Sequence, residues 1–175
     1  TSSSRPNGVS INTGPAILAA SLIKEIPNNQ PLLYFSSDNI INKFNIFKKS
    51  ILKNKKYLDF NNLFIFGIKP TSPSTEYGYF ITKKNKKINS VIKFYEKPNL
   101  FKAKKFLKKK AYWNSGMFFL RKDAIIYNFK KHQPKILINC LKAVSKSKSI
   151  NKSYYLNKKF FNQAPSKSFD YAILE

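Results

Sequence analysis

The feature that most constrains the fold is a strand, a helix and a second strand that follow one another over residues 31–70. The apolar run Leu32 to Phe35 predicts a short strand, which ends in the polar residues "SSDN". Apolar residues then recur at helical spacing, which predicts an amphipathic helix over 42–57. The stretch "NLFIFGIKP" predicts a second buried strand. Continuous apolar strands separated by a helix are typical of a mainly parallel sheet that is covered on both faces, so we expect an α/β fold.

The rest of the chain adds strands in the middle and helices at both ends. "YGYFIT" and "SVIKFYEKP" predict two antiparallel strands joined by an exposed lysine-rich loop, and a helix follows near 100–110. The run Met117 to Leu120 predicts a buried strand that begins after a turn formed by Asn114, Ser115 and Gly116. Two helices are expected, at about 122–131 and 134–145, and then a surface linker, "SKSKSINKSYY".

Capping residues predict where the terminal helices begin. Thr13 precedes Gly14-Pro15 and is expected to cap a helix that Pro27 stops, and Ser168 is expected to cap a helix at the C-terminal end. No repeat or interdomain linker interrupts the 175 residues. We therefore expect residues 1–175 to form a single domain.

Several classes of protein are excluded by residue counts. The chain has one Cys, Cys140, and one His, His132, so neither a disulfide framework nor a zinc site of His and Cys ligands can be built. A lone Cys fits a reducing compartment, and we expect a cytoplasmic protein. Cys140 falls on the apolar stripe of the helix at 134–145, which predicts a place in the core. No apolar run approaches the ~20 residues that cross a bilayer, so we expect no membrane partner.

The formal net charge of +25 favours binding of nucleic acid or phosphorylated ligands. However, Asn, Lys, Ile, Phe and Tyr are all abundant, as expected from an A+T-rich coding sequence, and the lysines are dispersed along the chain. We interpret the charge as compositional bias and do not expect nucleic acid as a partner.

The chemistry-bearing residues stand where predicted strands end. Asp38 closes the first strand, Gly78 lies in "EYGY", Glu96 and Lys97 close "VIKFYEKP", and Asn114 lies beside the later strand. Asp170 lies in "SFDYA" near the C-terminus. Ligands of open α/β sheets bind at the carboxyl ends of strands. Each residue taken singly also has an ordinary explanation, as a turn, cap or solvated charge.

In their order along the chain, these stretches resemble the motifs of one family. "NTGPAILAA", "SSDN", "FGIKPTSPSTEYGYF", "FYEKP", "YWNSGMFFL" and "SFDYAILE" are similar to the successive motifs of bacterial mannose-1-phosphate guanylyltransferases. The resemblance covers about residues 11–175. It implies a Rossmann-like mixed sheet of the nucleotidyltransferase (GT-A-like) type, and the reaction of GTP with mannose 1-phosphate to give GDP-mannose and pyrophosphate.

The resemblance also implies roles for individual residues at the sugar end. Asn114 would bind mannose hydroxyls, Glu96 would accept hydrogen bonds from them, and the Gly78 backbone would approach the ring. Lys97 would meet the sugar phosphate. Carboxylate and amide groups suit a fixed pattern of hydroxyls, and an ammonium offsets phosphate charge.

The resemblance further implies roles at the nucleotide end. Asn12 and Thr13 would face guanine, and Asp38 and Asp170 would hold Mg²⁺, which prefers hard oxygen ligands. Asp38, Lys97 and Asp170 would be the catalytic residues. If these roles are correct, the positions at 38, 78, 96, 114 and 170 converge on a single crevice.

The chain departs from the family in one large respect. The family opens with a glycine- and arginine-rich loop, G-G-x-G-x-R-L-x-P-L-S-R, that cradles the triphosphate, and no stretch here matches it. We therefore expect a chain that lacks the first β-α unit and is partial at both ends. Two alternatives stay open, namely a catalytically inactive sugar-phosphate-binding remnant and a nucleotidyltransferase for another hexose 1-phosphate. A homodimer is also considered.

Overall fold

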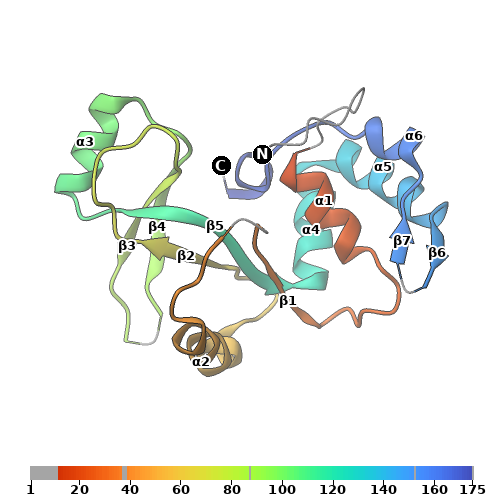
Figure 1. Ribbon diagram of the computed structural model, residues 1–175, viewed down its shortest axis with the longest axis horizontal. Coiled ribbons are helices and arrows are strands. Elements are labelled where there is room, and N and C mark those ends of the chain that lie inside the picture. The colour runs from red at the N-terminus through yellow and green to blue at the C-terminus, as the bar shows by residue number, and fades with distance from the viewer. Residues whose placement is uncertain (1–11, 37–38, 87, 152, 175) are drawn as a thin grey trace. The chain divides into compact units, whose positions relative to one another are not determined.

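The structure, a computed structural model, describes residues 12–36, 39–86, 88–151 and 153–174. These residues form two compact units, which Figure 1 shows together. The sheet unit comprises residues 28–124. The helical unit comprises residues up to 27 and residues 125–174.

The described residues of the sheet unit form five strands, and the other four are organised around the long strand β5. Their bounds are β1 Pro31–Tyr34, β2 Phe64–Ile68, β3 Tyr79–Lys83, β4 Ser90–Tyr95 and β5 Tyr112–Arg121. β1 and β2 both pair with residues Phe118 and Phe119 of β5, so they occupy its opposite edges. β3 pairs with Tyr112 and Trp113 at the start of β5 and also with β4. The strand order is therefore β1-β5-β3-β4, with β2 on the other edge of β5.

The expectation of a mainly parallel sheet is wrong for the described strands, because every pairing among them is antiparallel. β1 and β2 do run in the same direction, as the strand-helix-strand pattern requires. However, β5 lies between them and runs the opposite way, so the two parallel strands never share a ladder. The antiparallel β3–β4 hairpin is confirmed.

Two helices belong to the sheet unit, and they differ in how deeply they pack. α3 (Leu100–Lys108) buries Ala103 and Phe106 against Tyr79 and forms a small core. α2 (Phe44–Asn54), followed by a 3₁₀ turn at Lys55–Tyr57, buries no residue, although Phe47 contacts Phe66 of β2 with ring centroids 5.2 Å apart. The predicted helix is confirmed, but its apolar side is not buried in a core within the described residues.

The helical unit is built from α1, α4, α5 and shorter elements. Their bounds are α1 Thr13–Ser21, α4 Lys122–His132, α5 Pro134–Ser145, β6 Lys148–Ile150, β7 Ser153–Tyr155, α6 Lys158–Asn162 and η2 Asp170–Leu174, of which α4 begins in the sheet unit. Cys140 of α5 is fully buried and its Sγ lies 3.6 Å from the carbonyl oxygen of Pro15 in α1. The core position predicted for Cys140 is confirmed.

Three local predictions for the helical unit need correction. Asn12 rather than Thr13 caps α1, because its side-chain Oδ1 accepts a hydrogen bond from the Thr13 N–H at 2.9 Å. α1 ends at Ser21, well before Pro27. The stretch expected to be a linker forms the exposed β6–β7 hairpin, in which the backbone groups of the polar residues pair with each other. The capping role of Ser168 is confirmed, since its Oγ accepts from the Tyr171 N–H.

Candidate functional site

Alternation along the strands of the sheet unit separates two sets of side chains. Tyr79, Tyr95 and Trp113 are neighbours on β3, β4 and β5, and they pack together with α3 on one face. Successive residues of a strand point to opposite faces, so Gly78, Glu96 and Asn114, each one position away, belong to the other face. The sequence motifs "YGY", "YEKP" and "WNSG" are thus brought to one place by strand pairing.

Gly78, Glu96 and Asn114, which we call the Gly78 cluster, lie in direct contact range. The backbone N–H of Asn114 donates to the carbonyl oxygen of Gly78 at 2.8 Å. A β-carbon at position 78 would lie 2.6 Å from Oε2 of Glu96 and 3.4 Å from Cβ of Asn114. Gly78 is buried, and so is Oε2 of Glu96. The absence of a side chain at position 78 therefore leaves room for the carboxylate.

Asn114 is held by a local irregularity of β5. Ile65 pairs with Phe118 and Gly67 with Asn114, so three residues of β5 stand opposite the single Phe66. Within this bulge the Asn114 Oδ1 accepts from the Gly116 N–H, and the Ser115 Oγ accepts from the Met117 N–H, both at 3.2 Å. Gly116 adopts a φ of 71°, which favours glycine. The predicted turn before the strand is therefore a β-bulge inside it, a known device for aiming a side chain.

Lys97 follows the cluster with an unusual backbone conformation. Its φ is 42°, in the left-handed region that a residue with a side chain rarely adopts, and Pro98 comes next. Strain of this kind costs on the order of 1–3 kcal/mol and is concentrated at functional sites. The Lys97 side chain is exposed, which suits contact with a phosphate group.

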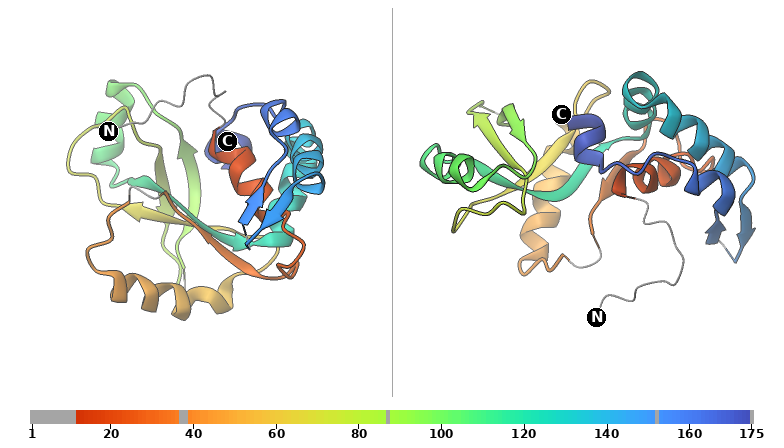
Figure 2. Two further views of the ribbon diagram at one scale, coloured as in Figure 1. Left: turned by 45° about the vertical axis from the view of Figure 1, so that its right-hand side comes forward. Right: turned by 90° about the horizontal axis from the view of Figure 1, so that it is seen from above.

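Asn12, Thr13 and Asp170 lie in the helical unit, where the start of α1 is tied to the C-terminal segment (Figure 2). The Thr13 Oγ1 accepts from the Phe169 N–H at 3.0 Å, and the Asn12 N–H donates to the Ser166 Oγ at 3.2 Å. Asp170, half-buried, is the first residue of η2. Asn12 and Thr13 thus have a structural role, and their contact with guanine stays a prediction.

Asp38 lies outside the described residues, and among those described no group of three His, Cys, Asp or Glu side chains could hold a metal ion. The convergence of positions 38, 78, 96, 114 and 170 on one crevice stays a prediction. Three of the five, those of the Gly78 cluster, do lie together.

Sequence reasoning missed one residue of this neighbourhood, Phe94. Its Cζ would lie 3.1 Å from a β-carbon at Gly78, so its ring is a wall of the cluster. The signal was present in the sequence, because Phe94 of β4 precedes Glu96 by two positions, and residues two apart along extended backbone share a face.

The sequence of the chain is similar to those of several known proteins. A family model described as nucleotidyl transferase matches residues 2–161. A mannose-1-phosphate guanylyltransferase of Escherichia coli is 35% identical over 176 residues, covering 94% of this chain and 38% of that protein. The xanthan biosynthesis protein XanB of Xanthomonas campestris is 36% identical over 166 residues, covering 94% of this chain and 36% of that protein. The chain thus spans a little over a third of the length of these curated relatives.

Two solved structures share the fold. A mannose-6-phosphate isomerase from Helicobacter pylori superposes with a TM-score of 0.82 at 28% identity, covering 96% of this chain and 66% of that one. A mannose-1-phosphate geranyltransferase from Thermus thermophilus gives a TM-score of 0.79 at 21% identity, covering 95% and 48% of the two chains. The expected nucleotidyltransferase-type sheet is confirmed. No described helix is long and apolar enough to cross a membrane.

Proposed function

Because the chain belongs to the nucleotidyl transferase family, we propose that it contributes the sugar-phosphate-binding part of a mannose-1-phosphate guanylyltransferase. The observation that supports this most directly is the Gly78 cluster, in which a buried carboxylate oxygen and an amide side chain meet over a glycine. Glu96 would accept hydrogen bonds from mannose hydroxyls, Asn114 would bind a neighbouring hydroxyl, and Gly78 would let the ring approach the backbone.

Lys97 would bind the phosphate of mannose 1-phosphate at the end of the same strand. Its ammonium group offsets phosphate charge, and Lys97 directly follows Glu96 in the sequence, with a backbone φ of 42°. The sugar-phosphate oxygen then attacks the α-phosphorus of GTP in line, the bond to the β-phosphate oxygen breaks, and pyrophosphate leaves. Catalysis of this kind depends on alignment and charge neutralisation more than on covalent chemistry.

Mg²⁺ is part of the proposal, with Asp38 and Asp170 as the residues that would hold it. Two carboxylates together with substrate phosphates are a usual ligand set for this ion. When bound, Mg²⁺ would neutralise charge on the phosphates. Asn12 and Thr13 are proposed at the guanine, with the start of α1 behind them. We also propose a cytoplasmic location, because the single Cys140 is a buried thiol, and a homodimer, which analytical ultracentrifugation tests directly.

Binding of the sugar by the Gly78 cluster is tested by calorimetric titration of mannose 1-phosphate into the wild type and into the variants Glu96→Gln and Asn114→Ala. We expect each variant to bind at least about tenfold more weakly, since each loses a hydrogen bond to a partly buried side chain, worth about 1.4 kcal/mol or more. Glu76→Gln, which removes an exposed carboxylate from the neighbouring loop, is the matched control and should bind like the wild type. Equal binding by all four proteins would overturn the assignment.

Release of pyrophosphate from GTP and mannose 1-phosphate tests the reaction separately. Turnover that depends on Lys97 and Mg²⁺ supports the guanylyltransferase. Binding of mannose 1-phosphate without turnover supports the inactive sugar-phosphate-binding alternative. Faster turnover with another hexose 1-phosphate would move the assignment to a different sugar.

A further inference from the structure

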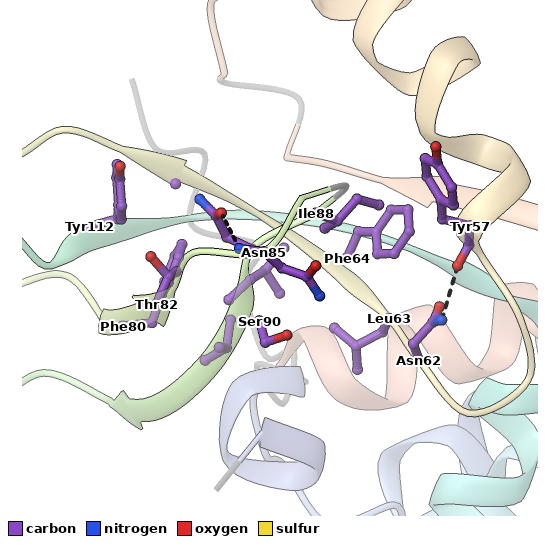
Figure 3. Close-up of a pocket in the computed structure, with 14 residues that line it drawn as sticks. Tyr57, Asn62, Leu63, Phe64, Phe80, Thr82, Asn85, Ile88, Ser90 and Tyr112 are labelled. Atoms are coloured by element: carbon purple, nitrogen blue, oxygen red, sulfur yellow. Dashed lines mark hydrogen bonds between the residues drawn. The ribbon is translucent and has the colours of Figure 1, made fainter.

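The sheet unit has a hollow whose lining includes none of the residues of the Gly78 cluster. It has a volume of about 740 Å³, within the usual range for small-molecule pockets. Residues from β2, β3, β4, β5, the β3–β4 loop and the segment after α2 line it, as Figure 3 shows. We call it the aromatic pocket, because Tyr57, Phe64, Phe80 and Tyr112 form much of its wall.

The aromatic pocket carries no charged side chain among the described residues that line it, although 23% of the whole chain is charged. A phosphate or carboxylate placed there would lose hydration without gaining a cation, which is costly. The pocket therefore suits an uncharged ligand and differs in this respect from the Gly78 cluster with its neighbour Lys97.

The lining combines flat aromatic surface with hydroxyl and amide groups. The Phe80 and Tyr112 rings are stacked, with centroids 5.7 Å apart and an interplanar angle of 26°. Thr82, Asn85 and Ser90 line the pocket as well, and their side chains can both donate and accept hydrogen bonds. An aromatic face is electronegative and attracts polarised C–H groups. A ring that has C–H faces and many hydroxyls on its rim matches both properties.

Gly67 shapes the floor of the aromatic pocket. A β-carbon there would lie 2.7 Å from Cζ of Phe80 and 2.9 Å from Cβ of Tyr112. Gly67 also pairs with Asn114, and Tyr112 stands two positions from Asn114 on β5, about 7 Å along the strand. The pocket and the Gly78 cluster thus share one face of the sheet as neighbouring but separate places.

We propose that the aromatic pocket binds an uncharged, polyhydroxylated ring compound of the carbohydrate class. The ligand stacks on the Phe80 and Tyr112 side of the pocket, and its hydroxyls bond to Thr82, Asn85 and Ser90. This second place for a sugar needs no phosphate and does not depend on the chemistry proposed for the Gly78 cluster.

The test is saturation-transfer NMR on the chain with methyl α-mannoside, a neutral probe, at millimolar concentration. Ser90→Trp fills the pocket from an exposed position of β4, and Ile92→Trp adds the same bulk at an exposed position of β4 that does not line the pocket. We expect the mannoside signal in the wild type, in Ile92→Trp and in Glu96→Gln, in which the Gly78 cluster no longer holds a mannose. We expect its loss when Ser90→Trp is combined with Glu96→Gln.

The two binding places give different patterns across these variants. Binding of mannose 1-phosphate should fall in Glu96→Gln and persist in Ser90→Trp. The two proposed binding sites can therefore be tested independently of each other. No mannoside signal in a folded wild type would overturn the proposal. So would a signal that is lost in Glu96→Gln and kept in Ser90→Trp. Binding of indole but not of the mannoside would show a pocket for apolar rings and would overturn the carbohydrate class.

Discussion

A β-carbon at Gly78 would lie 2.6 Å from Oε2 of Glu96, closer than two such atoms can approach. Strand pairing sets this relationship, since Tyr79 lies opposite Tyr95 and the next pair outward is Gly78 and Glu96. The carboxylate thus occupies the space that any other residue at position 78 would fill.

Replacing Gly78 with Ala should weaken the binding of mannose 1-phosphate more than it changes stability. The new methyl group displaces the end of the Glu96 side chain, which is flexible, so the fold adapts while the carboxylate leaves its position. We expect a loss in affinity of about tenfold, equivalent to about 1.4 kcal/mol, by calorimetry. Glu76→Gln, which removes an exposed carboxylate from the neighbouring loop, is again the control and should bind like the wild type. Unchanged affinity in Gly78→Ala would contradict this role of the glycine.

Replacing Lys97 with Gly should separate stability from binding. Glycine adopts a φ of 42° without strain, which recovers about 1–2 kcal/mol, and this gain is partly offset by its greater freedom in the unfolded chain. We expect a melting temperature equal to or above that of the wild type, together with weaker binding of mannose 1-phosphate. A lower melting temperature with unchanged binding would mean that the lysine side chain serves the fold.

Periodicity in the sequence predicted the elements that form the Gly78 cluster, because alternation alone puts positions 78, 96 and 114 on one face once three strands pair. It did not predict the antiparallel pairing of β1 and β2 with β5. Apolar runs indicate that a strand is buried, but they do not indicate which strand pairs with it or in which direction. The residues Ser115 and Gly116 predict a turn but form a bulge, since turns and bulges use the same residue types.

The contacts of Asn12 and Thr13 could be predicted from the sequence even less well. Their motif resembles a nucleotide-facing one, yet the described contacts of the Asn12 N–H and Thr13 Oγ1 are with Ser166 and Phe169, more than 150 residues away in the sequence. Local patterns cannot reveal such distant partners.

Gly14 offers a test of this distant contact. The Gly14 N–H donates to the carbonyl oxygen of Lys167 at 3.0 Å. A β-carbon would lie 2.6 Å from that same oxygen, which belongs to the backbone and cannot rotate away. Gly14→Ala should therefore destabilise the chain by about 1–3 kcal/mol, despite the better helix propensity of Ala. Urea unfolding measures this, and a gain in stability would show that the C-terminal segment is not held as described.

Because of Cys140, we expect the free energy of unfolding of the chain to fall at alkaline pH. Burial raises the pKa of its thiol to about 12, whereas the thiol of an unfolded chain has a pKa near ~8.5. Between these two values the unfolded chain releases a proton that the native chain keeps, so the free energy of unfolding falls as pH rises.

Below pH ~8 both forms keep the proton and the thiol adds no pH dependence. We expect wild type to lose up to about 1.4 kcal/mol per pH unit above pH ~9 relative to Cys140→Ala, which lacks the thiol but keeps every other titrating group. Urea unfolding of both proteins at several pH values from 7 to about 10 measures the difference. Parallel pH curves would show that the thiol ionises in the native chain, and rapid labelling of the native protein by a thiol reagent would show the same exposure directly.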